Sequence, residues 1–219
     1  MIIPLNPDNR GHIQAAADFH SRLLGEESPI PQLGERFCRD FYYGTLVRDG
    51  LFKCDLAIHE ERYIGWISYT LDPLHFMSRG LKHHFGMISR ILLVSIIKKP
   101  AMIGTILGVI RDMHNREIRA DGIYDKPFGE ILSFGVLEDS CALTDMETGE
   151  KYPRALFDRA IEYFRDNDLS RYRLAVRKWY KAALIFYLSY GGKIIDPNYD
   201  RDRSYRLEFT IPGVSSDPA

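Results

Sequence analysis

Apolar residues recur at helical spacing in four stretches of the chain. They lie in residues 11–25, 31–50, 154–169 and 180–192. In each stretch the apolar positions are three or four residues apart, which places them on one face of a helix. Glycine follows three of the stretches, as expected at a helix end. The pattern therefore predicts four amphipathic helices.

Between these helices the period shortens to two, which is typical of strands. Residues 51–71 contain two such runs around Glu60 and Glu61 and predict a β-hairpin. Three further strands are predicted in "RYRLAV", "KIID" and "SYRLEFTI", the last two paired with each other.

The stretch "GEILSFGVLED" is apolar on both faces, as expected for a central strand. Strict alternation places Ile131 with Gly135 on one face and Leu132 with Phe134 on the other.

Residues 74–117 form a long helical section that Pro100 divides into two helices. Its apolar residues exceed what one amphipathic face requires. Packing on the core is the first interpretation, and a homodimer interface is the second. A channel for a long acyl chain is the third. Membrane contact through Lys82, Lys98 and Lys99 ranks last because the basic residues are few.

Composition narrows the function class. The chain has 219 residues and a formal net charge of -1, so we expect one domain over residues 1–219 and no nucleic-acid binding. Three scattered cysteines and the absence of a zinc motif predict free thiols and no metal. No apolar run is long enough to span a membrane, and no signal peptide is seen. We expect a cytoplasmic protein with a disordered tail at about 212–219.

The order of elements resembles the GCN5-related N-acetyltransferase (GNAT) superfamily over about residues 11–209. The resemblance is strongest between Gly129 and Ile195. It implies an α+β fold with a mixed, mostly antiparallel central sheet flanked by helices, here with an extended helical insertion. It also implies acetyl-CoA, or another acyl-CoA, as co-substrate.

In the family, the strand that "ILSFGVLED" resembles splays from its parallel neighbour. Its unpaired backbone groups then bind the pantetheine arm of CoA. The resemblance assigns this role to the backbone of Phe134, Gly135 and Val136.

A glycine-rich loop and the helix after it hold the CoA pyrophosphate in the family. Here "TGEKYP" stands under that motif, with Lys151 in place of a glycine and Pro153 in place of a small residue. The resemblance leaves Gly149, Lys151 and Arg154 as the residues that could gather a phosphate.

The stretch "YKAALIFYLSYGGKI" resembles the family pattern N-x-x-A-x-x-F-Y, with Ala183, Phe186 and Tyr187 at the matching positions. Tyr180 replaces the asparagine that contacts the cofactor. The resemblance implies that Tyr187 protonates the departing thiolate as general acid.

A carboxylate is expected to accept the proton of the attacking amine, and Glu130 is the first candidate. The expected function is transfer of an acetyl group from acetyl-CoA to a small-molecule or peptide amine by direct attack. Two alternatives remain open. One is a non-catalytic GNAT-like module that binds a ligand or partner. The other is an acyltransferase that uses a longer acyl chain on CoA or on an acyl carrier protein.

Overall fold

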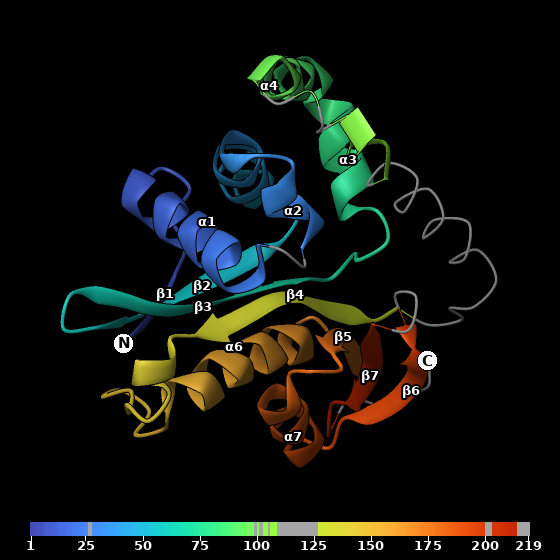
Figure 1. The fold of residues 1–219 in the computed structure, drawn as a ribbon. Coiled ribbons are helices and arrows are strands. Elements are labelled where there is room, and N and C mark those ends of the chain that lie inside the picture. Colours follow the sequence, from blue (N-terminus) through green and yellow to red (C-terminus); the bar gives the residue numbers. More distant parts are fainter. Residues whose placement is uncertain are drawn as a thin grey trace.

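The structure is a computed structural model that describes residues 1–25, 28–98, 100, 103–104, 106–108, 127–199 and 203–213. Figure 1 shows the chain. The first half of the described elements comprises β1 (Ile2–Pro4), α1 (Arg10–Leu24), α2 (Pro29–Gln32), η1 (Phe37–Leu46), β2 (Lys53–His59), β3 (Arg62–Thr70), α3 (Phe76–His83) and α4 (Phe85–Lys98). The second half comprises β4 (Gly129–Val136), η2 (Glu138–Ser140), α6 (Tyr152–Asp166), β5 (Arg171–Arg177), α7 (Lys181–Ser189), β6 (Lys193–Asn198) and β7 (Ser204–Thr210).

The strands form one seven-stranded sheet in the order β1-β2-β3-β4-β5-β7-β6. Within it β4 and β5 are parallel, and every other pair of neighbours is antiparallel. The predicted α+β class with a mostly antiparallel sheet is confirmed.

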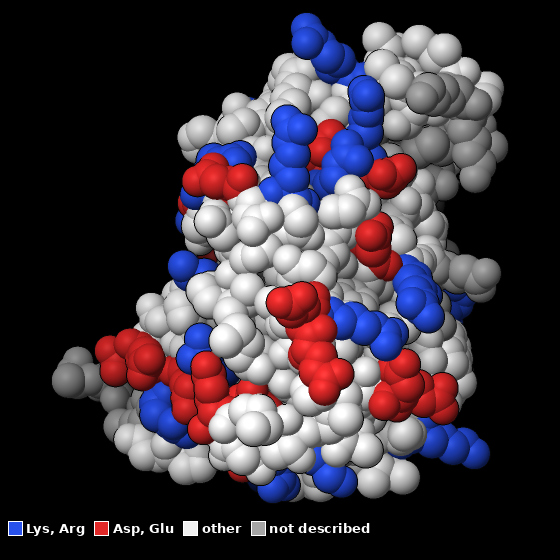
Figure 2. All heavy atoms as spheres, turned by 90° about the vertical axis from the view of Figure 1, so that its left-hand side faces the viewer, with Lys and Arg blue, Asp and Glu red and all other residues white. Residues whose placement is uncertain are grey.

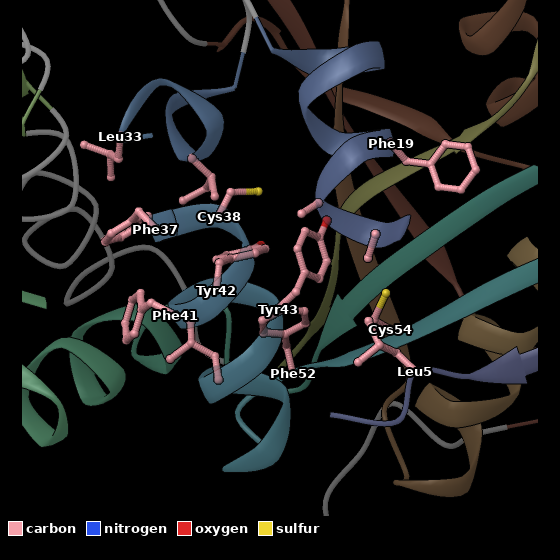
Figure 3. Packing of buried hydrophobic residues seen from close by; sticks show 14 of the residues in the cluster. Leu5, Phe19, Leu33, Phe37, Cys38, Phe41, Tyr42, Tyr43, Phe52 and Cys54 are labelled. Carbon is pink, nitrogen blue, oxygen red and sulfur yellow. The ribbon is translucent and has the colours of Figure 1, made fainter. Parts of the chain in front are cut away.

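Helices cover both faces of this sheet. The helices α1, α2 and η1 pack on one face of β1–β4, and α6 and α7 lie on the other side (Figure 1). Each side has its own hydrophobic core. Figure 3 shows part of the first core, with Phe41, Tyr42 and Tyr43 on η1 and Phe19 on α1. The sheet therefore separates two apolar layers, and a ligand can reach it only where strands part or helices are missing.

The predicted hairpin and its turn are confirmed. Glu60 and Glu61 have φ angles of 48° and 62°, the left-handed pair that a two-residue turn between twisted strands requires. The strand β1, which joins the edge of β2, was not predicted. Three residues are too few to show a period.

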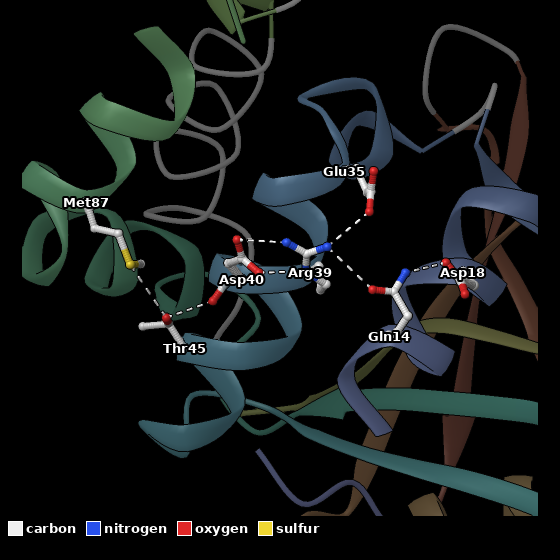
Figure 4. A network of polar contacts seen from close by, with 7 residues as sticks. All are labelled: Gln14, Asp18, Glu35, Arg39, Asp40, Thr45 and Met87. Carbon is white, nitrogen blue, oxygen red and sulfur yellow. Dashed lines mark hydrogen bonds and ion pairs between the residues drawn. The ribbon is translucent and has the colours of Figure 1, made fainter. Parts of the chain in front are cut away.

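The single helix predicted over residues 31–50 is wrong. Gly34 has a φ of 104° and interrupts it, so the short α2 is followed by η1. The η1 helix has π-type geometry over ten residues, with Phe37, Phe41 and Leu46 buried as expected. Arg39 of η1 bonds Gln14 of α1, Glu35 and Asp40 (Figure 4). Ion pairs near the surface contribute little to the stability of a protein, so we expect these contacts mainly to orient η1 relative to α1.

The two faces predicted for β4 are corrected at Ile131 and Leu132. Ile131 packs with Phe134 on the α6 side, and Leu132 packs on the α1 side. The cause is an irregularity in the pairing with β3, where Ser68 pairs with Ser133 but the next residue pairs with Ile131. The extra residue in β4 is Leu132, and it exchanges the two side chains.

The section before Pro100 contains two helices, α3 and α4, where one was predicted. The break falls at His84, whose imidazole Nε2 lies 2.6 Å from the carboxylate of Asp49. The helix α4 ends at Lys98, so the predicted stop before Pro100 is confirmed. The predicted second helix lies largely outside the described residues, and so do residues 214–219 of the tail.

Candidate active site

The strands β4 and β5 pair only at their first residues. Gly129 pairs with Tyr172 and Glu130 with Arg173, and within these described strands the pairing goes no further. Beyond that point β4 pairs only with β3, and β5 pairs only with β7. Figure 1 shows β4 diverging from β5 and β7. The edge of β4 from Ile131 to Val136 therefore faces a wedge, and its backbone groups there have no strand partner.

Aromatic side chains line the wedge on the α6 and α7 side. Phe134 of β4 is half-buried, and its ring centroid lies 5.8 Å from Phe157 of α6 and 5.9 Å from Phe186 of α7. The ring of Tyr187 lies 6.4 Å from that of Phe134. The structure thus brings together Phe134 and Tyr187, two predicted site residues that are 53 positions apart in the sequence.

Tyr187 is buried, with 7% of its surface exposed. Burial raises the pKa of its phenol well above the ordinary value, because the phenolate would lose its hydration. Within the described part of the chain its hydroxyl has no hydrogen-bond partner. A protonated phenol with a free donor next to the wedge can protonate a thiolate that forms there.

The two other predicted residues of this segment have different surroundings. Ala183 is half-buried on α7 and packs with the same aromatic core. Tyr180 precedes α7 at the N-cap position and is 38% exposed, and its ring lies 6.2 Å from Trp179. Tyr180 therefore begins the helix but does not join the aromatic lining.

Glu130 lies at the closed end of the wedge, on the opposite face of β4 from Phe134. It is 9% exposed, and its carboxylate lies 3.7 Å from Arg206 of β7. Arg173, its partner in register on β5, pairs with Glu208 at 2.6 Å. These side chains point away from α6 because the alternate residues of β5 and β7 pack on that helix. A carboxylate and a phenol thus flank the strand from its two faces.

Gly135 is explained by packing. A Cβ on this residue would lie 2.6 Å from the indole of Trp66 and 3.0 Å from Leu23, so the glycine makes room for the α1 side of the core. Val136 is half-buried on the α6 side and pairs with Gly65 of β3. Both residues still present backbone to the wedge, as predicted.

The loop between β4 and α6 closes on itself. Gly149, with a φ of 73°, donates its amide to the carbonyl of Asp145, and Thr144 bridges to Lys151. Lys151 is exposed at the N-cap of α6, and Arg154 is exposed one turn on. Both basic residues therefore lie at the start of α6, and their role in holding a phosphate stays a prediction.

The amides of the first turn of α6 are already used. The amide of Tyr152 donates to the carbonyl of Leu143 at 3.1 Å, and Pro153 has no amide hydrogen. The amides of Arg154 and Ala155 both donate to the carbonyl of Lys151. A phosphate at this helix end would therefore be held by side chains, without the free amides that helix N-termini usually offer.

Asp158 was not singled out in the sequence. Burial raises the pKa of its carboxyl to about 6, and a hydrogen bond shared with Glu150 adds to the rise. Arg154, next to it on α6, lies over the ring of Tyr190 at 5.8 Å. The acidic neighbours therefore balance part of the positive charge of Arg154, which leaves less of it for a phosphate.

A buried polar network behind β4 was also missed. The Nδ1 atom of His20 lies 2.9 Å from the hydroxyl of Tyr43, which accepts the indole hydrogen of Trp66 at 2.9 Å. The same hydroxyl lies 3.4 Å from Ser133 of β4. The Nε2 atom of His20 lies 2.7 Å from the hydroxyl of Ser28, so both ring nitrogens of this buried histidine have a hydroxyl partner. The network fixes the position of β4 from the α1 side.

The described residues include no cluster of His, Cys, Asp and Glu suited to hold a metal ion. No helix among them has both the length and the apolar character to cross a bilayer.

Comparison with known proteins finds similarity in structure only. No protein-family model matches the chain, and no curated protein is significantly similar to it. NAA60 of Arabidopsis thaliana, solved with a bisubstrate analogue, is 15% identical with a TM-score of 0.52, over 97% of this chain and 98% of that one.

Two further structures match in the same way. The aminoglycoside 6'-acetyltransferase type Ii is 11% identical, with a TM-score of 0.55 over 100% of this chain and 99% of that chain. The PaiA N-acetyltransferase of Thermoplasma acidophilum, in complex with coenzyme A, is 12% identical, with a TM-score of 0.51 over 96% and 98%. At these identities the likeness is one of fold, and the predicted GNAT-like fold is confirmed.

Proposed function

Because the chain has the fold of the GCN5-related N-acetyltransferases, we propose that it is an N-acyltransferase that moves an acetyl group from acetyl-CoA to an amine. The observation that carries the proposal is the wedge, which opens after Glu130 and has Tyr187 on one side. The backbone edge of β4, through Phe134, Gly135 and Val136, would pair with the amides of the pantetheine arm. This pairing would orient the thioester for attack.

In the proposed reaction the amine nitrogen attacks the thioester carbonyl and the carbon–sulfur bond breaks. The departing thiolate takes the proton of the Tyr187 hydroxyl, and the amine proton passes to the carboxylate of Glu130. The two groups lie on opposite faces of β4, which suits a thioester lying between acceptor and leaving group. Glu130 and Phe134 pair with Thr70 and Ile67, three strand steps or about 10 Å apart, so we expect water to relay the amine proton.

The acyl donor could instead be a chain on an acyl carrier protein, which is the second candidate. The occupied amides at the start of α6 favour this second candidate. If CoA were the donor, only the side chains of Lys151 and Arg154 would be available to hold its pyrophosphate. A carrier-bound pantetheine has a single phosphate and makes less demand on this loop. The acceptor is an amine of small-molecule or peptide class, as in the relatives.

Calorimetry with acetyl-CoA and with CoA tests the proposal. We expect both to bind, and acetyl-CoA to be consumed in the presence of a panel of amines. Binding without consumption would favour the non-catalytic module, and the absence of binding by either would exclude the CoA-dependent reaction. If an acetylated carrier protein is consumed while acetyl-CoA is not, the second candidate is correct.

A further inference from the structure

The side of α4 that faces away from the protein carries large apolar residues. Ile88 and Ile91 are buried against the core, whereas Phe85, Leu93 and Ile97 are 73%, 58% and 73% exposed. Phe85, Leu93 and Ile97 are eight and four residues apart, so they lie along one side of the helix. We call these three residues the α4 patch. An outward apolar stripe on a surface helix indicates that something covers it.

The segment around the α4 patch is basic. From Pro73 to Arg111 the sequence has no Asp or Glu and holds six of the 29 Lys and Arg residues. The rest of the chain holds the other 23 basic residues and all 30 acidic ones, so its net charge is negative. The uppermost part of the molecule, where α4 lies in Figure 1, shows blue and white atoms in Figure 2. The end of the molecule that carries α4 therefore combines exposed apolar side chains with basic ones.

Basic side chains flank the patch itself. Arg90 precedes Leu93 by three residues and Ile97 by seven, so it shares their face of the helix. Lys82 is exposed on the last turn of α3. In the described part of the chain neither Arg90 nor Lys82 forms an ion pair, so both charges are available to a partner.

The patch is held firmly on the body of the protein. His84, at the junction of α3 and α4, bonds Asp49 at 2.6 Å. The hydroxyl of Thr45 in η1 lies 4.0 Å from the sulfur of Met87 in α4 (Figure 4). The helix that carries the apolar stripe is therefore joined by polar contacts to η1 and to the residue Asp49 that follows it.

We propose that the α4 patch docks on an anionic lipid bilayer, with α4 lying in the interface and its apolar stripe turned toward the acyl chains. Apolar insertion and basic flanks are the two features that bind a helix to such a surface. Each Lys or Arg near an anionic membrane strengthens binding by about fivefold. Composition alone ranks this partner last, but the exposed stripe and the absence of acidic neighbours reverse that order.

A second copy of the chain fits the patch less well. A two-fold symmetric contact would place each patch on its own equivalent and bring the same basic residues together, with no acidic side chain in the segment to balance them. The bilayer supplies both an apolar layer and the opposite charge. The inference does not depend on the proposed acyl transfer.

Flotation of the full-length protein with vesicles tests the docking. One set contains phosphatidylcholine alone, and the other contains 30% phosphatidylserine. We expect binding to the second set only, weakening as salt rises from 50 to 500 mM. Leu93→Glu with Ile97→Glu should lower the partition coefficient at least tenfold, and Arg90→Glu at least fivefold. Thermal melts of each variant check that it is folded.

Ile185→Glu is the matched control, because Ile185 is a 68% exposed isoleucine on another helix, α7. It should bind vesicles as the unchanged protein does. Equal binding to both vesicle types, or no binding to either, would overturn the proposal. So would a lipid-free dimer that the Leu93 and Ile97 changes abolish, or capture of a purified acidic acyl carrier protein at this patch in preference to vesicles.

Discussion

The ring of Phe134 on β4 lies 6.4 Å from the ring of Tyr187 on α7, at the point where β4 and β5 have parted. This relationship joins a strand edge that can bind an amide-containing ligand to a hydroxyl that can give up a proton. The proposed chemistry depends on the two acting on the same bound thioester.

Replacing Tyr187 by phenylalanine should lower kcat by about 100-fold, because the thiolate would leave without its acid. The affinity for CoA should change less than about threefold, since the ring and its packing remain. Steady-state kinetics and calorimetry measure the two quantities. Tyr190→Phe, at the C-cap of the same helix, is the control and should keep its kcat. Unchanged turnover in Tyr187→Phe would leave the hydroxyl with a purely structural role.

Glu130→Gln should lower kcat/KM about 10- to 100-fold for amines that are protonated at neutral pH. The loss should shrink at high pH, where the amine is already neutral. The variant also removes the charge opposite Arg206, so we expect a loss of about 1–3 kcal/mol in the free energy of unfolding. Glu138→Gln, beyond the end of β4, is the control. A loss that is constant across pH would contradict the role of base.

S-acetyl-pantetheine should react nearly as well as acetyl-CoA, with kcat/KM lower by no more than about tenfold, if the occupied amides of α6 contribute little to pyrophosphate binding. Arg154→Ala should then affect acetyl-CoA only and bring the two donors closer. A thousandfold preference for acetyl-CoA that survives Arg154→Ala would show that the loop opens to bind the pyrophosphate.

Gly135→Ala should destabilise the protein by about 1–3 kcal/mol, since the new methyl group would overlap Trp66. At Gly149 a Cβ would meet open space. Gly149→Ala should therefore lower the free energy of unfolding by about 1–2 kcal/mol through the positive φ alone. The two can be told apart by adding Trp66→Leu. This change should relieve most of the loss at Gly135 and none of the loss at Gly149 in denaturant unfolding.

His20 should make stability fall as the solution is acidified. Burial lowers its pKa to about 3, so below pH 6.5 the unfolded chain binds a proton that the folded chain does not. The free energy of unfolding should therefore drop by about 1.4 kcal/mol per pH unit between 6 and 4 from this group. His20→Gln should flatten that part of the profile, whereas His83→Gln, on the exposed end of α3, should not. Parallel slopes in all three proteins would contradict this role of His20.

Periodicity was sufficient for elements whose own residues define a face. Leu156, Ala160 and Phe164 identified α6, and the glutamate pair identified the hairpin turn. The break at His84 was missed because histidine carries no helix-stop signal, and it depends on a contact with the distant Asp49.

The site shows the same division. The family resemblance brought Phe134 and Tyr187 to one place, which spacing within either segment could not do. The use of the α6 amides by Leu143 and Lys151 depends on how the loop folds back, and no motif records it. Gly135 was expected to serve the cofactor, yet its lack of a side chain is required by Trp66, a neighbour on another strand.

Hydrogen exchange of the β4 amides with and without CoA tests the central claim most directly. Bound CoA should slow exchange in the peptide covering Ile131–Val136, because its pantetheine would pair with that edge. The exposed residues of α7, around Ile185, should exchange as before. Binding of CoA with unchanged exchange in β4, and protection elsewhere, would contradict the placement of the acyl donor in the wedge.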